Sequence, residues 1–148
     1  MKMKPLFLLL LVLITMGATA QGSDAKRDKI KALKTSLLTT KLELTSTEAE
    51  KFWPVYNAFE EKQYDIRHKK MHSLIDKLKD GSAEKMNEKE AAVFLSQLQS
   101  AEDDLYQNRK KLVTNLKNII SPIKIIKLKK AEEDFNRTLL KEYRGKKE

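Results

Sequence analysis

Two histidines, His68 and His72, are the first candidates for chemistry, because a pair four residues apart on a helix can share one metal ion. Lys69 stands where the glutamate of a His-Glu-x-x-His metalloprotease motif would be. Positive charge on Arg67, Lys69 and Lys70 opposes a bound cation. We therefore expect a solvent-facing pair, with metal binding as the alternative.

Other routes to catalysis are closed by composition. The chain has no Cys, which excludes a thiol nucleophile, a cysteine zinc site and a disulfide scaffold. With four Gly, it contains neither a GxGxxG nor a GxxxxGK phosphate-binding loop. The spacing of Ser, His and acidic residues suggests no catalytic triad. We expect a protein without enzymatic activity and without a cofactor.

The strongest charge asymmetry lies between Leu105 and Ala131, where eight residues are basic and none is acidic. One interpretation is a solvated face that aids solubility. The other is a surface that attracts acidic client proteins over long range. The chain also places six aliphatic residues within the second half of this stretch, so the surface would be both basic and apolar. The basic residues are Arg109, Lys110, Lys111, Lys117, Lys124, Lys127, Lys129 and Lys130.

Composition also bounds the architecture that must position these residues. The 148 residues amount to one domain, 34% of them are charged, and Gly and Pro together number seven. Such a profile is typical of long helices and not of a β-sandwich or barrel. We therefore predict an all-α fold, with a single domain over residues 21–148.

The first twenty residues are predicted to be a signal peptide. A basic start is followed by the apolar run Leu6–Met16 and by Ala18-Thr19-Ala20, a pattern that predicts cleavage after Ala20. The run is too short for a helix that spans about 30 Å of hydrocarbon; an uncleaved anchor is the alternative. No Cys follows it, which excludes a lipid anchor. We expect a periplasmic protein, with no stable membrane insertion and no nucleic-acid partner.

Capping signals divide the rest of the chain into four helices. The first is expected over residues 24–41, and the second starts at the capping box Thr45–Glu48, with Leu44 as a hydrophobic staple, and ends near Lys79. Pro54 predicts either a kink near residues 49–53 or the end of a short helix there. A third helix starts at a second capping box, Asn87–Glu90. Ser121-Pro122 starts a fourth helix, which ends near Tyr143 before a frayed tail, 144–148.

Two apolar patterns predict how these helices pack. Phe52, Tyr56 and Phe59 share one helical face, which indicates a core cluster, with an exposed client patch as the alternative. In the third helix Asn108 and Asn115 occupy two positions of an apolar stripe, where buried Asn can determine the register; exposure of both is the alternative. The stripe contains Ala91, Phe94, Leu98, Ala101, Leu105, Leu112 and Ile119.

The second and third helices must run antiparallel because a short turn joins them. Their facing stretches, 60–73 and 99–111, carry few large apolar residues, so a monomer would bury little surface. We therefore expect an extended helical hairpin with two flanking helices, completed by a second copy in a homodimer.

These features resemble the Spy/CpxP family of periplasmic proteins, which carry LTxxQ motifs. Leu44-Thr45-Ser46-Thr47-Glu48 matches the first motif, with Glu48 where the family has Gln. Ile120-Ser121-Pro122-Ile123-Lys124 matches the second, in which Ile120 and Lys124 replace Leu and Gln. The segment 48–57, EAEKFWPVYN, is similar to a branch described as sensors of extracytoplasmic sigma factors.

The resemblance implies an antiparallel homodimer shaped like a shallow cradle and an ATP-independent chaperone activity. The leading hypothesis is therefore a holdase that binds unfolded or misfolded envelope proteins through the basic and apolar surface. The alternative is a regulatory protein of the envelope stress response, which binds a folded sensor or anti-sigma partner.

Overall fold

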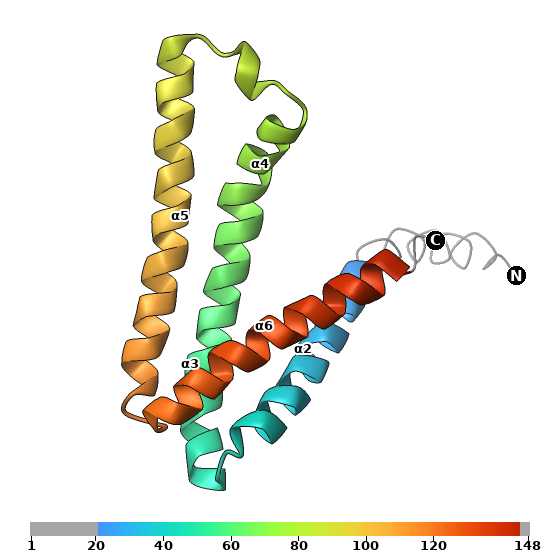
Figure 1. The fold of residues 1–148 in the computed structure, drawn as a ribbon, viewed down its shortest axis with the longest axis vertical. Coiled ribbons are helices and arrows are strands. Elements are labelled where there is room, and N and C mark those ends of the chain that lie inside the picture. Colours follow the sequence, from blue (N-terminus) through green and yellow to red (C-terminus); the bar gives the residue numbers. More distant parts are fainter. Residues whose placement is uncertain (1–20, 146–148) are drawn as a thin grey trace, which may run out of the picture. The chain divides into compact units, whose positions relative to one another are not determined.

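The structure, a computed structural model, describes residues 21–145, without the side chains at 21, 23, 24 and 143–145. The predicted signal peptide and the last three residues of the predicted tail lie outside these residues. The described chain is all-α and contains no strand, which confirms the predicted fold class (Figure 1). Its elements are α2 (Gln21–Leu42), α3 (Ser46–Asp65), the π-helical η1 (Ile66–Met71), α4 (His72–Lys79), the 3-10 turn η2 (Ala83–Lys85), α5 (Glu88–Leu116) and α6 (Pro122–Gly145).

The chain packs as two compact units, and the boundary between them falls within α6. One unit consists of residues 43–129 and is called the hairpin unit below. Among the described residues, the other unit combines 21–42 with 130–145. Each unit is described by itself.

The hairpin unit pairs the continuous helical rod α3–η1–α4 with α5, in antiparallel directions (Figure 1). The rod ends at Lys79, as predicted, because Gly81 adopts a φ of 74° that an L side chain disfavours. Asp80 stabilises the same turn by accepting a hydrogen bond from the Ser82 amide at 2.8 Å. The predicted antiparallel helical hairpin is thus confirmed.

Local capping explains where the helices begin. The Thr45 hydroxyl accepts from the Glu48 amide at 3.2 Å, and Glu48 Oε2 accepts from the Thr45 amide at 2.9 Å. Asn87 and Glu90 form the equivalent pair at the start of α5. Both predicted capping boxes are therefore confirmed. At α6, Pro122 is the first helical residue and the Ser121 hydroxyl accepts from the Lys124 amide at 3.4 Å.

Helix α3 does not end at Pro54, so one of the two expectations for this position is wrong. The helix includes Pro54 and continues to Asp65. Glu50, whose carbonyl would receive the missing amide bond, is exposed, as is Pro54. Water can therefore satisfy that carbonyl, which reduces the cost of proline inside a helix.

The aromatic cluster of α3 is core, as the first interpretation of it predicted. Phe52 is fully buried, Tyr56 is 2% exposed and Phe59 is 5% exposed. The rings of Phe52 and Tyr56 stack with centroids 5.3 Å apart, and Trp53 meets Phe52 edge-on at 5.0 Å. Such contacts add to the burial of three large side chains. An exposed client patch at this cluster is excluded.

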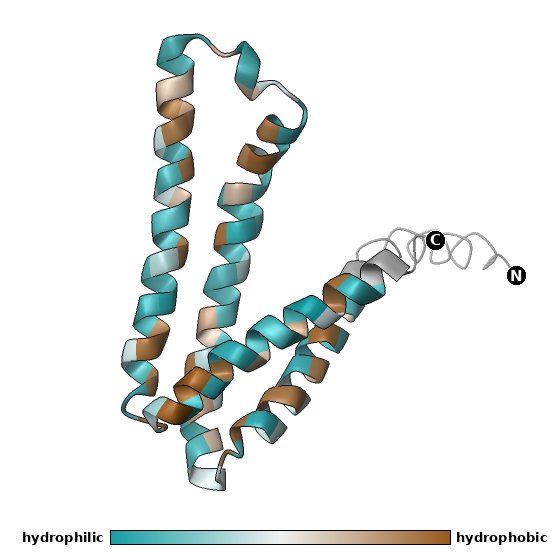
Figure 2. Ribbon diagram, viewed as in Figure 1, coloured by the Kyte–Doolittle hydropathy of each residue, from teal (hydrophilic) through white to brown (hydrophobic). Residues whose placement is uncertain are grey.

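Polar contacts connect the two helices in the middle of the hairpin, where the sequence has few large apolar residues. Figure 2 shows mostly hydrophilic residues along this part of the hairpin. The Asn108 side-chain amide donates to the Phe59 carbonyl at 3.1 Å and to Gln63 Oε1 at 3.3 Å, and Lys70 pairs with Asp104. Asn108 is therefore partly buried and connects the two helices, whereas Asn115 is exposed, so the expectation that both are exposed is wrong.

In the other unit, α2 lies beside the C-terminal part of α6 and runs antiparallel to it (Figure 1). Leu38, Leu42, Ala131 and Phe135 are buried. The Lys34 ammonium lies 5.8 Å from the centre of the Phe135 ring, a cation–π contact. The predicted first and fourth helices are thus confirmed as elements, and both are longer than expected.

Candidate functional site: a basic and apolar surface

The eight basic residues of the stretch between Leu105 and Ala131 lie on α5, on α6 and in the turn between these two helices. Arg109, Lys110 and Lys111 lie on the C-terminal half of α5, Lys117 follows at its end, and the others lie on the first turns of α6. Seven of the eight belong to the hairpin unit, and Lys130 belongs to the other unit. The structure divides them into ion-paired residues and residues without a carboxylate partner.

Three of the predicted client-binding lysines are engaged with acidic residues. Lys124 Nζ lies 2.7 Å from Glu48 Oε2 and donates to the Glu43 carbonyl at 2.8 Å. Lys127 pairs with Glu43 at 3.3 Å. Lys130 pairs with Asp134 at 3.1 Å, one turn further along α6. These side chains connect or stabilise helices, so they contribute less positive potential to a binding surface than the sequence suggested.

The Glu48–Lys124 pair joins two motifs that are far apart in the sequence. Glu48 accepts simultaneously from Lys124 and from its own capping partner, Thr45. Both charged side chains are about four-fifths covered. The hydrogen bond from Lys124 holds the pKa of the Glu48 carboxyl below its usual value, and the Thr45 amide adds to this effect.

We predict that this pair makes stability depend on pH. A depressed carboxyl pKa contributes stability that is present above the unfolded pKa of about 4.3 and lost as the pH falls through the lower folded value. Glu48→Gln should therefore lower the urea midpoint at pH 7. The difference from the wild-type midpoint should shrink at pH 3, where the wild-type carboxyl is increasingly protonated.

Urea unfolding of both proteins at the two pH values measures this effect, with Glu50→Gln, an exposed residue of the same helix, as the control. An equal destabilisation by Glu48→Gln at pH 7 and pH 3 would contradict it.

Four lysines remain exposed and have no carboxylate partner within the described residues. These are Lys110, Lys111, Lys117 and Lys129. Arg109 is half-buried and lies over the Phe59 ring at 4.5 Å, so it also stabilises the hairpin. The available positive charge is therefore concentrated on the C-terminal half of α5, the turn after it and one lysine of α6.

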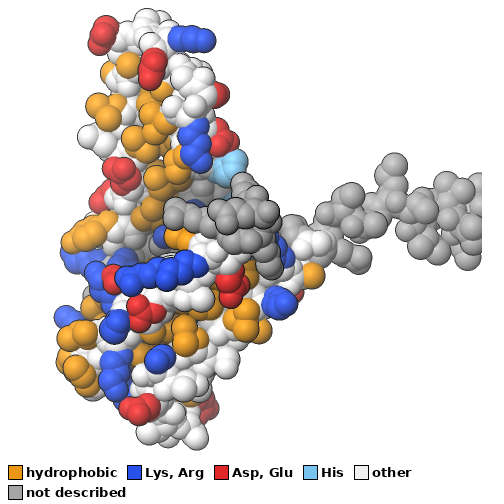
Figure 3. Space-filling model, turned by 45° about the vertical axis from the view of Figure 1, so that its right-hand side comes forward, with side chains coloured by type: hydrophobic (Ala, Val, Ile, Leu, Met, Phe, Trp, Pro, Cys, Tyr) orange, Lys and Arg blue, Asp and Glu red, His pale blue; other side chains and the backbone are white. Residues whose placement is uncertain are grey.

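Exposed aliphatic side chains accompany these lysines. Ile123 is 59% and Ile126 is 65% exposed, whereas Ile120 and Leu128 of the same stretch are buried. On the face drawn in Figure 3, lysine and arginine side chains lie among apolar and acidic ones. The predicted mixture of basic and apolar groups is thus present, but only part of the aliphatic set is available to a partner.

A groove of about 660 Å³ between α3 and α5 lies in the same unit. We call it the α3–α5 groove. Its apolar lining consists of Pro54, Val55, Ala58, Phe59 and Leu112. Its polar lining consists of Lys62, Asp104, Gln107, Asn108, Lys111 and Asn115. The sequence pattern did not reveal this groove, although the two Asn positions in the apolar stripe were a signal that the seam is not uniformly packed.

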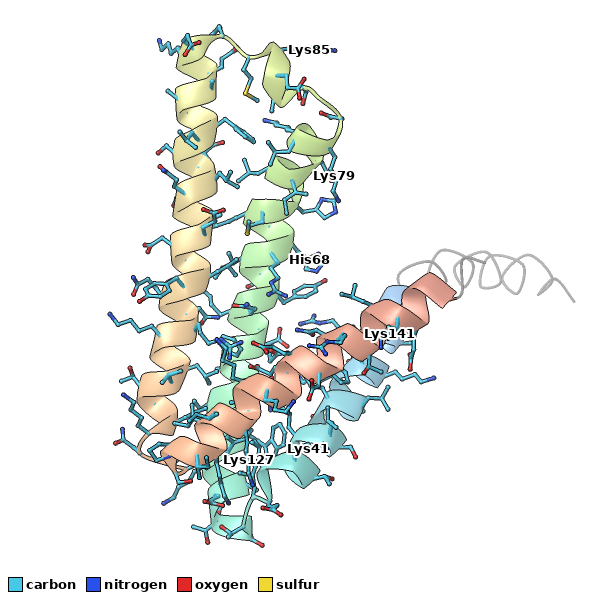
Figure 4. All side chains as sticks on the ribbon, in the orientation of Figure 1. Lys41, His68, Lys79, Lys85, Lys127 and Lys141 are labelled. Carbon is cyan, nitrogen blue, oxygen red and sulfur yellow. The ribbon has the colours of Figure 1, made fainter. Side chains whose placement is uncertain are left out.

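The two histidines, His68 and His72, are both exposed, and their ring centroids are 6.5 Å apart. His68 lies on the side of the rod that faces away from α5 (Figure 4). The ring centroids of His68 and Tyr64 are 4.0 Å apart, and His72 Nδ1 lies 2.9 Å from Asp76 Oδ2. Among the described residues, no group of three or more His, Cys, Asp or Glu side chains could hold a metal ion.

Within residues 21–145, no helix is both long and apolar enough to cross a membrane. The chain matches no protein-family model, no curated protein and no solved structure.

Proposed function

We propose that the protein is an ATP-independent periplasmic holdase, similar to the Spy/CpxP family, that binds unfolded or misfolded envelope proteins. The observation that carries this proposal is the set of four exposed lysines without carboxylate partners within the described residues, together with the exposed Ile123 and Ile126 of α6. Acidic side chains of a client would supply the missing partners. The apolar groups would then hold segments that a folded protein keeps inside.

Capture would begin with electrostatic attraction. The full chain has a net charge of +9, and the predicted signal peptide accounts for two of these charges, Lys2 and Lys4. Residues 21–148 therefore carry a net charge of +7. Long-range attraction raises the rate of encounter with an acidic chain and weakens as salt is added. Exposed aliphatic side chains would then add contacts that require no particular client sequence. Neither step requires nucleotide.

The Glu48–Lys124 pair supports the resemblance on which the proposal partly depends. These residues stand at the two motif positions where the family has Gln, and they lie 2.7 Å apart. Two of the three departures from the LTxxQ pattern, Glu48 and Lys124, therefore form an ion pair with each other. The two motif-like segments keep the positions at which they start α3 and α6.

The proposal includes a homodimer. Val93 and Leu95 on the N-terminal half of α5 are each 54% exposed, and a thin hairpin buries little apolar surface by itself. A second copy that covered this end of α5 would leave the lysines of the opposite half accessible. Sedimentation equilibrium of residues 21–148 measures the mass directly.

Light scattering tests the holdase function. We expect a stoichiometric amount of residues 21–148 to suppress aggregation of an acidic client that is unfolded by reduction of its disulfides. Suppression should be weaker at about 1 M salt, where the Debye length is about 3 Å, and weaker for a basic client. Each client alone at each salt concentration is the control.

Unchanged scattering of the acidic client at low salt would refute the holdase. Binding of one folded sensor or anti-sigma protein with defined stoichiometry, without suppression of aggregation, would instead favour the regulatory alternative.

A further inference from the structure

The α3–α5 groove has the length of a short extended peptide. Its lining runs from Pro54 to Lys62 on α3, which corresponds to about 12 Å at 1.5 Å per helical residue. An extended chain rises about 3.3 Å per residue. About four residues of an extended segment therefore match the length of the groove.

The floor of the groove suits one large apolar side chain. Val55 and Leu112 line it from opposite helices, and Ala58 stands between bulkier neighbours on α3. Ala58 is exposed, and its side chain is the smallest in the lining of the groove. A leucine or phenylalanine of a bound segment would cover these groups and remove their apolar surface from water.

The polar side of the groove offers partners for a peptide backbone. The side-chain nitrogen of Asn108 donates hydrogen bonds to the Phe59 carbonyl and to Gln63 Oε1. The side-chain oxygen of Asn108 can therefore still accept a hydrogen bond from a peptide amide. The exposed Asn115 amide lines the same groove and can both donate and accept. Side-chain amides bind backbone groups of any sequence, as a holdase requires.

The charge of the groove selects among such segments. Lys62 on α3 and Lys111 on α5 line it and are both exposed. The lining contains one carboxylate, Asp104, which forms an ion pair with Lys70 and also interacts electrostatically with Lys62. Neither Lys62 nor Lys111 forms an ion pair within the described residues, so both can attract carboxylates of an occupant.

We infer that the α3–α5 groove binds one extended polypeptide segment of about four residues, in which acidic side chains flank a large apolar side chain. This inference rests on the proposed function and names the kind of client segment that the holdase recognises. The apolar side chain would lie over Ala58, and the acidic residues would pair with Lys62 and Lys111. Backbone groups would bond to Asn108 and Asn115.

A substitution that fills the groove tests the inference without changing charge. We expect Ala58→Trp to weaken binding of a fluorescent acidic peptide with a central phenylalanine by about tenfold or more, the effect of losing a central contact. Fluorescence anisotropy measures the affinity. Ala92→Trp is the matched control, because Ala92 is also an exposed helical alanine but does not line the groove. Urea unfolding verifies that both variants fold.

Charge selection has a separate test. The double variant Lys62→Gln/Lys111→Gln should bind the acidic peptide about tenfold more weakly and should bind an analogue with Asn in place of Asp as the wild type does. The control is Lys79→Gln/Lys85→Gln, which removes two exposed lysines near the tip of the hairpin, outside both the groove and the proposed client-binding lysines.

Equal peptide affinity of wild type and Ala58→Trp, with aggregation still suppressed, would overturn the groove inference and leave the holdase function standing. A change in self-association by Ala58→Trp, without a change in peptide affinity, would identify a second copy as the occupant and would also overturn it. Failure of the wild type both to suppress aggregation and to bind any peptide would instead refute the proposed function.

Discussion

Replacing Phe52 with alanine is expected to lower the free energy of unfolding by about 3–5 kcal/mol. Phe52 is fully buried and contacts the rings of both Trp53 and Tyr56. Truncation would remove its apolar burial and leave a cavity that neighbouring side chains cannot fill completely. The loss would be a large fraction of the total stability of a typical domain, about 5–15 kcal/mol.

Urea unfolding, followed by circular dichroism, measures this effect. Tyr64→Ala is the control, because Tyr64 is an aromatic residue of the same helix but is 38% exposed; we expect a loss below about 1 kcal/mol. If Phe52→Ala does not fold, Phe52→Leu should fold with a smaller loss, since it removes less volume. Equal effects of Phe52→Ala and Tyr64→Ala would contradict the position of Phe52 in the core.

The second large effect is expected from reversing the four lysines that have no carboxylate partner. Lys110→Glu, Lys111→Glu, Lys117→Glu and Lys129→Glu together change the net charge of residues 21–148 from +7 to −1. Attraction of an acidic client would become repulsion near these helices. We expect loss of aggregation suppression at low salt and a fall in the association rate of about ten- to a thousandfold. Stopped-flow fluorescence with a labelled acidic client measures that rate.

A matched control separates the position of the lysines from the total charge. Lys77, Lys79, Lys85 and Lys89 are exposed near the tip of the hairpin, two of them labelled in Figure 4, and no ion pair engages them within the described residues. Reversal of these four produces the same net charge. It should reduce the association rate less than reversal of the first set. Equal losses would show that net charge alone attracts the client and would contradict a localised surface.

Much of the fold could be predicted because its determinants are local. The two partners of each capping box, Thr45 with Glu48 and Asn87 with Glu90, are three residues apart in the sequence. A capping box can therefore be predicted without knowledge of how the helices pack. Gly81 and the apolar spacing of α3 are equally local signals. The same reasoning predicted an antiparallel hairpin, since a short turn leaves two long helices no other arrangement.

Pro54 and the π-helical η1 show where local reasoning fails. Proline inside α3 is tolerated because the affected turn faces solvent, and a sequence window does not contain that exposure. The π-helical turn Ile66–Met71 has no signal of its own in the sequence pattern. Both depend on which side of the rod packs against α5.

The candidate site depended even more on tertiary structure. The sequence by itself determined that the stretch from Leu105 to Ala131 is basic, that it contains aliphatic residues and that it spans the end of one helix and the start of another. Only the tertiary structure decided that Lys124 and Lys127 meet Glu48 and Glu43, that Asn108 is half-buried while Asn115 is exposed, and that a groove remains between α3 and α5. The physical reason is the range of the interactions. Capping and periodicity act within one or two helical turns, whereas Lys124 and Glu48 are separated by 76 positions and are brought together only when the helices pack.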